Sequence, residues 1–577
     1  MGPRRLPVLL LVLASCSSAR PPPAPVEPPR AAEAPPAPAP APDLPPPLPP
    51  PAAEELQPLV HAEPIDPLEL LWSHRLEFAN GTPIVTIRLM EGQQEIAFRP
   101  RAAGRLRPRG APAVEVPAGE VLRVRARDAL PAALSRFPLL AQLEFRDRAG
   151  LEAARRTWEG RGVRNRLRLV GGVYGIAGRV IDNRRLLLLA EGDGSAAWAR
   201  SFAEEAFRRW GERISVFTEL LTRPGGTLEV LDGAGARIAS GDTVVSLEVS
   251  GNAGFVVSAV EHDVGYAAHG FEDRAFRGRL YLTLDASGRL AAVHGIGLEE
   301  LLRGLVPSEM PPGAPAEALK AQAVTARSNV LAEVGTRHLS DPYVLCSEVH
   351  CQAYRGESAE VASTDAAVRS TAGEALFGRA DRALVNAVYS AVCGGHGEDN
   401  EAVWGDLPDP NLRGRPDLAP GEGAGRNGGL SDPERLRAFV DAAPPAYCGR
   451  RKNFRWERRF SRAEVDAIAA PLGVGTVAAL EIPSRGVSGR ARVLRISGSQ
   501  GTAFVRGELE IRRLFRNLPS AMFLAERDGA GWTFRGGGWG HGVGMCQWGA
   551  VGRAEARQDY RQILRHYYGG AEVARIY

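Results

Sequence analysis

The sequence predicts an α+β protein in which a mixed domain of helices and antiparallel strands follows β-rich and small βαβ-type segments. Residues 82–126 alternate apolar and polar side chains at period two, which is typical of short antiparallel strands. Strand-like stretches near 142–145, 167–170, 185–189 and 214–216 are interrupted by helical stretches at 150–160 and 196–210, which favours two β-α-β units. A helix rich in Ala, Leu, Lys and Gln is expected over residues 316–334.

Length and composition indicate a multidomain globular chain. Its 577 residues exceed one ordinary domain, and 44% hydrophobic with 24% charged residues allows most of the chain to bury a core. The 71 basic and 67 acidic residues are interspersed, so we expect no nucleic-acid partner. The expected parts are a signal segment over 1–16, a tether over 17–65, a β-rich segment over 66–140, a small α+β segment over 141–240 and a large domain over 241–577.

The first residues predict export. Arg4 and Arg5 precede an apolar run far shorter than the ~20 residues of a membrane-spanning helix. The run ends in Leu13-Ala14-Ser15-Cys16, which resembles a bacterial lipobox, so Cys16 is the expected acylated residue of a lipoprotein. A serine after this cysteine favours, by resemblance, the periplasmic face of an outer membrane. The alternative is a signal peptide that is cut elsewhere, with Cys16 discarded.

A Pro/Ala-rich stretch over residues 21–53 is expected to form a tether. It has almost no side chains that can form a core. At ~3.1 Å per residue, extended polyproline of this length reaches roughly 100 Å. The membrane would be touched through the lipid anchor only.

Glu309 is the strongest candidate for chemistry. Pro307 and Pro311 are expected to interrupt any helix between residues 298 and 316, which would place Glu309 on a rigid connection with its carboxylate pointing into a cleft. On the helix that follows, residues 319, 323, 326 and 330 form the expected apolar stripe. Lys320 and Arg327 are seven residues apart and share one face, which by itself predicts a solvated face.

Several ordered blocks resemble the stage II sporulation protein D family, whose domain also occurs in amidase-enhancer proteins. The blocks are residues 298–310 with Pro307-Ser308-Glu309-Met310, 318–327, Cys351-Gln352-Ala353-Tyr354-Arg355-Gly356, 389–395 with Cys393-Gly394-Gly395, Ser488-Gly489-Arg490 and 538–550. The resemblance implies a lytic transglycosylase that cleaves MurNAc-GlcNAc bonds of peptidoglycan, particularly in strands stripped of stem peptides.

The implied chemistry needs a single carboxylate. A glycoside hydrolase usually requires a second one, at ~5–5.5 Å or ~6.5–9.5 Å from the first. In a lytic transglycosylase the muramic C6 hydroxyl is the nucleophile, so Glu309 serves as acid and then as base, and a 1,6-anhydro end is left. No cofactor is required for this reaction. Glu398 and Asp399 are the nearest candidates for a second acid.

The remaining groove candidates also come from the match. Lys320 and Arg327 would line the groove beside Glu309, although a nearby cation lowers a carboxyl pKa, so burial must dominate. The segment 536–550 has seven glycines, which allow close backbone approach to a ligand, or alternatively a tightly packed turn. The further candidates for contacting sugar are Tyr389, Trp539, His541 and Gln547. The family usually carries Ser at the position of Cys546.

Five cysteines follow Cys16, and an odd number in an exported protein leaves at least one outside a disulfide. His338, Cys346, His350 and Cys351 fall within fourteen positions and offer the ligand atoms of a structural zinc site. Some members of the family carry zinc in this stretch. The alternative in an oxidising compartment is a disulfide such as Cys346 to Cys351.

Other functions stay open at this point. The first alternative is a non-catalytic amidase activator or glycan-binding module, with a cell-wall amidase as partner. The second is a true muramidase, which releases reducing ends. Residues 142–240 faintly resemble SPOR-type repeats, which bind stripped glycan strands, and the alternative is a small spacer domain.

Overall fold

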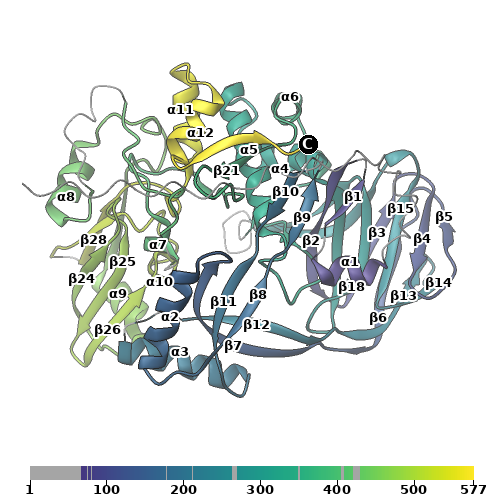
Figure 1. The fold of residues 1–577 in the computed structure, drawn as a ribbon, viewed down its shortest axis with the longest axis horizontal. Helices are drawn as coiled ribbons and strands as arrows, with labels where there is room; N and C mark the ends of the chain where they lie inside the picture. The colour runs from purple at the N-terminus through teal and green to yellow at the C-terminus, as the bar shows by residue number, and fades with distance from the viewer. Residues whose placement is uncertain are drawn as a thin grey trace, which may run out of the picture. The chain divides into compact units, whose positions relative to one another are not determined.

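The computed structural model describes residues 66–577 apart from 75, 80, 177–178, 211, 213, 263–268, 349–350, 405–407, 420–428 and 530. These residues belong to one compact unit, Pro64–Tyr577. The signal segment, Cys16 and the tether lie outside the described residues, as does His350. Within the described part, no helix has both the length and the apolar character needed to cross a membrane. The unit is mixed α+β, which confirms the predicted fold class (Figure 1).

Two antiparallel sheets form the N-terminal part of the unit. The first has the order β1-β2-β19-β18-β15-β4-β5, with β20 parallel to β2, and the second has the order β14-β13-β6-β3-β16-β17. The short helix α1 (Pro67–Ser73) precedes them. Their bounds are β1 (Glu77–Ala79), β2 (Thr82–Gln93), β3 (Glu95–Pro100), β4 (Gly104–Pro108), β5 (Val114–Val116), β6 (Leu122–Leu130), β13 (Gly225–Leu231), β14 (Arg237–Asp242), β15 (Val244–Val249), β16 (Phe255–His262), β17 (Gly270–Phe276), β18 (Arg279–Leu284), β19 (Leu290–Gly297) and β20 (Leu345–Cys346).

Strand pairing in these sheets crosses the domain boundary expected near residue 240. Strand β3 pairs with β16, and β2 pairs with β19, so early strands share sheets with strands that lie about 150 or more residues later. Phe98, Phe255 and Leu280 have 0% exposure inside a common core. The early β-rich segment and residues 244–297 therefore fold together, because each supplies strands that the other needs to complete its sheets.

A four-stranded antiparallel sheet with two helices is inserted between these strands. Its order is β12-β7-β11-β8, and its elements follow each other as strand, helix, two strands, helix and strand, with a small hairpin added before β11. This is the split βαβ, or ferredoxin-like, topology. The elements are β7 (Ala133–Glu144), α2 (Arg148–Gly160), β8 (Asn165–Val170), the hairpin β9 (Val173–Ile176) and β10 (Arg179–Asp182), β11 (Arg185–Ala190), α3 (Ala196–Trp210) and β12 (Ser215–Thr222).

Helix α5 (Ala316–Glu333) is the central helix of the C-terminal part, where it packs against α4, α6, α11, α12 and strand β21 (Figure 1). Fifteen of its eighteen residues are buried, including the four of the expected apolar stripe and several polar ones, so the buried surface extends beyond that stripe. Neighbours on all sides bury a helix all round, and small Ala residues allow them to approach closely. The neighbours are α4 (Leu298–Glu309), α6 (Ala362–Ser370), α11 (Gln547–Glu555), α12 (Tyr560–Tyr567) and β21 (Glu374–Gly378), which pairs with β30 (Ala571–Arg575).

Glu309 is the last residue of α4, and not part of a linker between two helices. The expectation that Pro307 interrupts this helix is wrong. Pro307 lies in the final turn, where it removes one N–H from the helical ladder, but the helix continues to Glu309 and the backbone N–H of Met310 still bonds to Val306 O at 2.9 Å. Glu309 is therefore positioned by a helix end, which is stiffer than a connecting loop.

The rest of the C-terminal part contains two three-stranded sheets and two short parallel strands. The sheets have the orders β23-β28-β27 and β24-β25-β26, and Phe460, Phe523 and Phe534 belong to a second core there. The bounds are β22 (Tyr389–Ser390), α7 (Asn400–Val403), α8 (Pro433–Ala442), β23 (Trp456–Ser461), α9 (Arg462–Ala469), β24 (Val477–Arg485), β25 (Ala491–Gly498), β26 (Gly501–Arg506), α10 (Glu508–Leu514), β27 (Phe523–Arg527), β28 (Gly531–Gly536) and β29 (Met545–Cys546), which is parallel to β22.

Candidate active site

The carboxylate of Glu309 is held by two segments that are distant in sequence. Its Oε1 accepts the backbone N–H of Ala353 at 2.6 Å, and its Oε2 accepts from Gln547 Nε2 at 3.3 Å. Gln547 also donates to the backbone carbonyl of Glu309 at 3.1 Å, so it fixes the helix end as well as the side chain. The blocks around residues 309, 351 and 547 thus meet at one point.

Burial raises the pKa of Glu309 above its ordinary value, and hydrogen bonds from Ala353, Gln547 and Tyr389 only partly oppose this effect. Among the described residues, none of the groups that shift this pKa is a cation. Burial therefore dominates the pKa of Glu309, as the role of a general acid requires. A carboxyl group in this position retains its proton to higher pH, as a general acid requires.

Tyr389 extends the contacts of Glu309. Its phenol donates to Gln352 Oε1 at 3.0 Å and also lies within hydrogen-bonding reach of Glu309. Burial raises the pKa of Tyr389 well above its usual value, so the phenol stays protonated. The single phenol proton can be donated to either Gln352 or Glu309, and the contact with Glu309 opposes the rise in the pKa of that carboxyl.

The imidazole of His541 links two backbone segments in this region. Its Nε2 lies 2.9 Å from the carbonyl oxygen of Tyr389, and its Nδ1 accepts the N–H of Val543 at 3.1 Å, which fixes one neutral tautomer. Burial lowers the pKa of His541 to about 3, so the ring does not carry a proton at neutral pH. The sequence analysis predicted that His541 contacts sugar, but both of its ring nitrogens already have backbone partners.

Two exposed tryptophans near His541 present stacking surfaces. Trp539 is 46% exposed and pairs through its backbone with Val392, and Trp404 is 46% exposed with its ring centroid 5.1 Å from that of His541. Exposed indole faces are suited to sugar rings. Sequence reasoning found Trp539 but missed Trp404, which stands outside the recognised blocks. It also gave no role to Gln352 and Ala353, although their block was recognised.

The two cations expected beside Glu309 have other partners. Arg327 has 0% exposure and forms a two-pronged ion pair with Glu299, with two N–O distances of 2.7 Å, while it also donates to Glu374 O at 2.9 Å. Lys320 pairs with Glu317 at 2.7 Å. Arg327 cannot line a groove, because α5 turns this side chain into the core.

The candidate second acid, Glu398, is also a structural group. It is 1% exposed, accepts from Ser488 Oγ at 2.6 Å and from the N–H of Asp399 at 2.9 Å, and lies near Arg490. Burial raises the pKa of Glu398. Because its oxygens are enclosed by these partners, Glu398 does not face an open site.

His338, Cys346 and Cys351 come together as the sequence expected, with their candidate ligand atoms within 4.8 Å of one another. His338 Nε2 lies 3.2 Å from Cys351 Sγ, and the two sulfurs are 3.1 Å apart, too far for a disulfide. His338 Nδ1 contacts Asp341 Oδ2 at 2.9 Å, the outer contact that usually orients a ligating imidazole. One imidazole and two thiols are donor groups of the kind that bind zinc. A buried group of Cys393, Asp417, Cys448 and Cys546 could also hold a structural metal.

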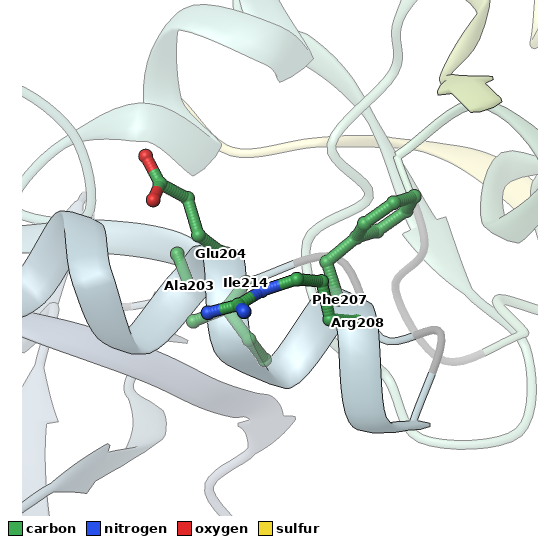
Figure 2. Close-up of a pocket in the computed structure, with 5 residues that line it drawn as sticks. All are labelled: Ala203, Glu204, Phe207, Arg208 and Ile214. Carbon is green, nitrogen blue, oxygen red and sulfur yellow. The ribbon is translucent and has the colours of Figure 1, made fainter. Parts of the chain in front are cut away.

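A shallow pocket of about 470 Å³ lies elsewhere, along α3. Figure 2 shows its lining side chains, Ala203, Glu204, Phe207, Arg208 and Ile214. The guanidinium of Arg506 lies 4.6 Å from the centre of the Phe207 ring. None of the predicted site residues lines this pocket, so it does not bear on the chemistry of Glu309.

Comparisons with known proteins agree with the motifs. Residues 286–377 match the family model described as Stage II sporulation protein, and residues 398–544 match a domain of unknown function. The chain is 28% identical over 306 residues to stage II sporulation protein D of Bacillus subtilis, which covers 49% of this chain and 76% of the relative. It is 27% identical over 291 residues to the amidase enhancer of Bacillus subtilis, which covers 47% and 40%.

A further relative is an uncharacterised protein of Brachyspira hyodysenteriae, 28% identical over 286 residues, with 49% of this chain and 68% of that protein covered. The chain is thus a distant homologue of the stage II sporulation protein D and amidase-enhancer family over about half its length, which confirms the resemblance predicted from the motifs. The match spans less than half of the amidase enhancer.

The buried ion pair gives a stability prediction. Arg327→Ala removes a fully buried guanidinium with its bonds to Glu299 and Glu374 O, and we expect a loss of roughly 3–5 kcal/mol in the free energy of unfolding, measured by urea denaturation. Lys320→Ala on the same helix removes a partly exposed pair and should cost less than about 1 kcal/mol. Equal losses in the two variants would contradict the structural role of Arg327.

The raised pKa of Glu309 gives a pH prediction. The folded state favours the neutral carboxyl, so its stabilising contribution is present below the ordinary pKa and is lost as pH rises through the folded-state value. Glu309→Gln does not titrate, so its melting temperature relative to the native chain should increase between pH 4 and pH 8. Glu300→Gln, on the first turn of the same helix, is the matched control. A difference that does not change with pH would refute the assignment.

Proposed function

We propose that this protein is a peptidoglycan lytic transglycosylase that cleaves MurNAc-GlcNAc bonds and leaves 1,6-anhydro-MurNAc ends. The observation that carries the proposal is the setting of Glu309, which is a proton-retaining carboxyl held by Ala353 and Gln547, with no cation among the described groups that shift its pKa. Homology to the stage II sporulation protein D family supports the same reading. Denuded glycan strands are the proposed substrate.

Glu309 acts twice in the proposed reaction. It first donates its proton to the glycosidic oxygen as the bond to the muramic C1 breaks, and the N–H groups of Ala353 and Gln547 then stabilise the new carboxylate. The carboxylate next removes the proton of the C6 hydroxyl as that oxygen bonds to C1. The proton returns to Glu309, so the residue is regenerated without water as nucleophile. Tyr389 lies within hydrogen-bonding reach of the carboxyl through its phenol hydroxyl.

We propose that His338, Cys346 and Cys351 are ligands of a zinc ion. His350 is the fourth ligand expected from the sequence. A closed zinc site supplies a cross-link and no reactive chemistry. Cys346 lies on β20, and Cys351 comes two residues before Ala353, whose N–H holds Glu309. The cross-link would therefore stabilise the backbone that positions the acid.

The sequence and the relatives support a setting in the cell envelope. We place the protein on the periplasmic face of an outer membrane, anchored at Cys16, with the Pro/Ala-rich tether carrying residues 66–577 towards the glycan. The ferredoxin-like insert over residues 133–222 is a candidate glycan-binding module, in line with the SPOR-like rhythm of its sequence. Roles in sporulation, division and general wall turnover are all compatible with these features.

A second function is favoured by one comparison. Homology to an amidase enhancer supports a protein that binds glycan and activates a cell-wall amidase without cutting the strand. In that case the protein would act by binding glycan near Glu309, and the proton of Glu309 would not be needed.

Glu309→Gln separates these functions. We expect the variant to bind sacculi as the native protein does and to form anhydro-muramic products at least about 100-fold more slowly, because general acid–base catalysis contributes on the order of 10²–10⁴. Mass spectrometry of glycans released from amidase-treated sacculi measures the products, with Glu300→Gln as the control. Unchanged anhydro products in Glu309→Gln would overturn the enzyme proposal. Reducing ends from the native protein would instead identify a muramidase.

A further inference from the structure

Three cysteines and one aspartate from four separate segments meet in the interior beside the candidate active site. Cys393 follows β22, Asp417 lies in a long loop, Cys448 follows α8 and Cys546 ends β29. Their exposures are 2%, 1%, 0% and 1%, and one candidate ligand atom from each lies within 4.8 Å of the others. We propose that these four side chains bind a structural zinc ion, separate from the His338 group.

The distances from Cys393 to two of the other side chains match a tetrahedral zinc site. With Zn–S bonds of about 2.3 Å and a Zn–O bond of about 2.0–2.2 Å, tetrahedral geometry places two sulfurs about 3.8 Å apart and a sulfur and an oxygen about 3.5 Å apart. Cys393 Sγ lies 3.7 Å from Cys448 Sγ and 3.4 Å from Asp417 Oδ2. The sulfur–sulfur distance is too long for a disulfide.

The sulfurs are surrounded by backbone donors, which stabilise thiolates. Cys546 Sγ accepts from the N–H groups of Cys393 and Gly549, both at 3.2 Å, and the second of these lies at the N-terminal end of α11. Cys393 Sγ accepts from the N–H of Gly395 at 3.4 Å. Thiolate ligands select zinc over hard cations such as Mg²⁺ or Ca²⁺.

Asp417 is oriented by an outer layer of contacts. Arg553 holds its Oδ1 at 2.9 and 2.7 Å, so Oδ2 is left to face the sulfurs, where Tyr567 also donates at 2.9 Å. A Cβ at position 549 would lie 2.3 Å from Asp417 Oδ2, so glycine is required there for the carboxylate to approach.

The charges of the cluster favour a cation. Three thiols and a carboxyl group lie together in a buried space, where their ionised forms would repel one another. A divalent ion removes this repulsion, and the charge that remains is offset by Arg553 and by Arg455, which bonds to Gly394 O at 2.9 Å.

The proposed ion would stiffen the site of Glu309. Cys546 precedes Gln547, which donates to Glu309, and β29 pairs with β22, which carries Tyr389. A bond from zinc to Cys393 and Cys546 would therefore fix the two short strands that present these contacts. The ion acts through position and does not touch the reacting sugar.

Zinc content tests the proposal in the full-length protein, purified without chelator and with zinc in the medium. A Cys351→Ser background removes a residue of the other group, so its zinc belongs to this cluster. We expect one zinc ion per chain in Cys351→Ser and its loss in Cys351→Ser/Cys448→Ser, measured by mass spectrometry of the metal. Equal zinc in both proteins would overturn the proposal.

A second measurement does not depend on the folding of the Cys448 variant. Replacement of zinc by Co²⁺ in Cys351→Ser should give thiolate-to-cobalt charge-transfer absorption, and chelation should lower the melting temperature. Absence of this absorption, or a disulfide between two of Cys393, Cys448 and Cys546 in a non-reducing peptide map, would refute the site. None of these measurements depends on glycan cleavage, so their outcome is independent of the role of Glu309.

Discussion

The contact between the backbone N–H of Ala353 and the carboxyl of Glu309 is the interaction on which the site depends. It joins the end of α4 to the segment that follows β20, and Gln547 closes the arrangement from the start of α11. Ala353 and Gln547 are both neutral donors, so they orient the carboxyl without pulling its proton away as a cation would. Burial then determines the pKa of Glu309. A helix end, a loop and the start of a second helix together position this general acid.

This arrangement needs a rigid support, which α5 and its ion pair supply. Arg327 joins α5 to Glu299 at the start of α4, and it also bonds to the carbonyl of Glu374, at the start of β21. The position of α4 relative to α5 is therefore fixed at the opposite end from Glu309. A cation that resembles a substrate contact in the sequence instead holds the scaffold together, because the interior offers it a carboxylate with matching two-pronged geometry.

Two clusters of possible metal ligands lie close in sequence to the hydrogen-bond partners of the acid. His338, Cys346 and Cys351 lie just before Ala353, and Cys546 lies just before Gln547. Each partner of Glu309 is thus one or two residues from a cluster. Cross-links placed so close to both hydrogen-bond donors would limit their motion without entering the reaction, which is a common use of structural metals in small, loop-rich regions.

The sequence by itself determined the fold class, most of the early strands, the two helices of the insert, and Glu309 with the blocks that now surround it. These features depend on local periodicity and on short motifs, which act over a few residues. Only the tertiary structure decided that α4 continues through Pro307, that Arg327 is internal, and that β2 and β3 pair with strands beyond residue 240. It also brought together Cys393, Asp417, Cys448 and Cys546, which are spread over some 150 positions, because burial and long-range pairing depend on packing partners that no local spacing records.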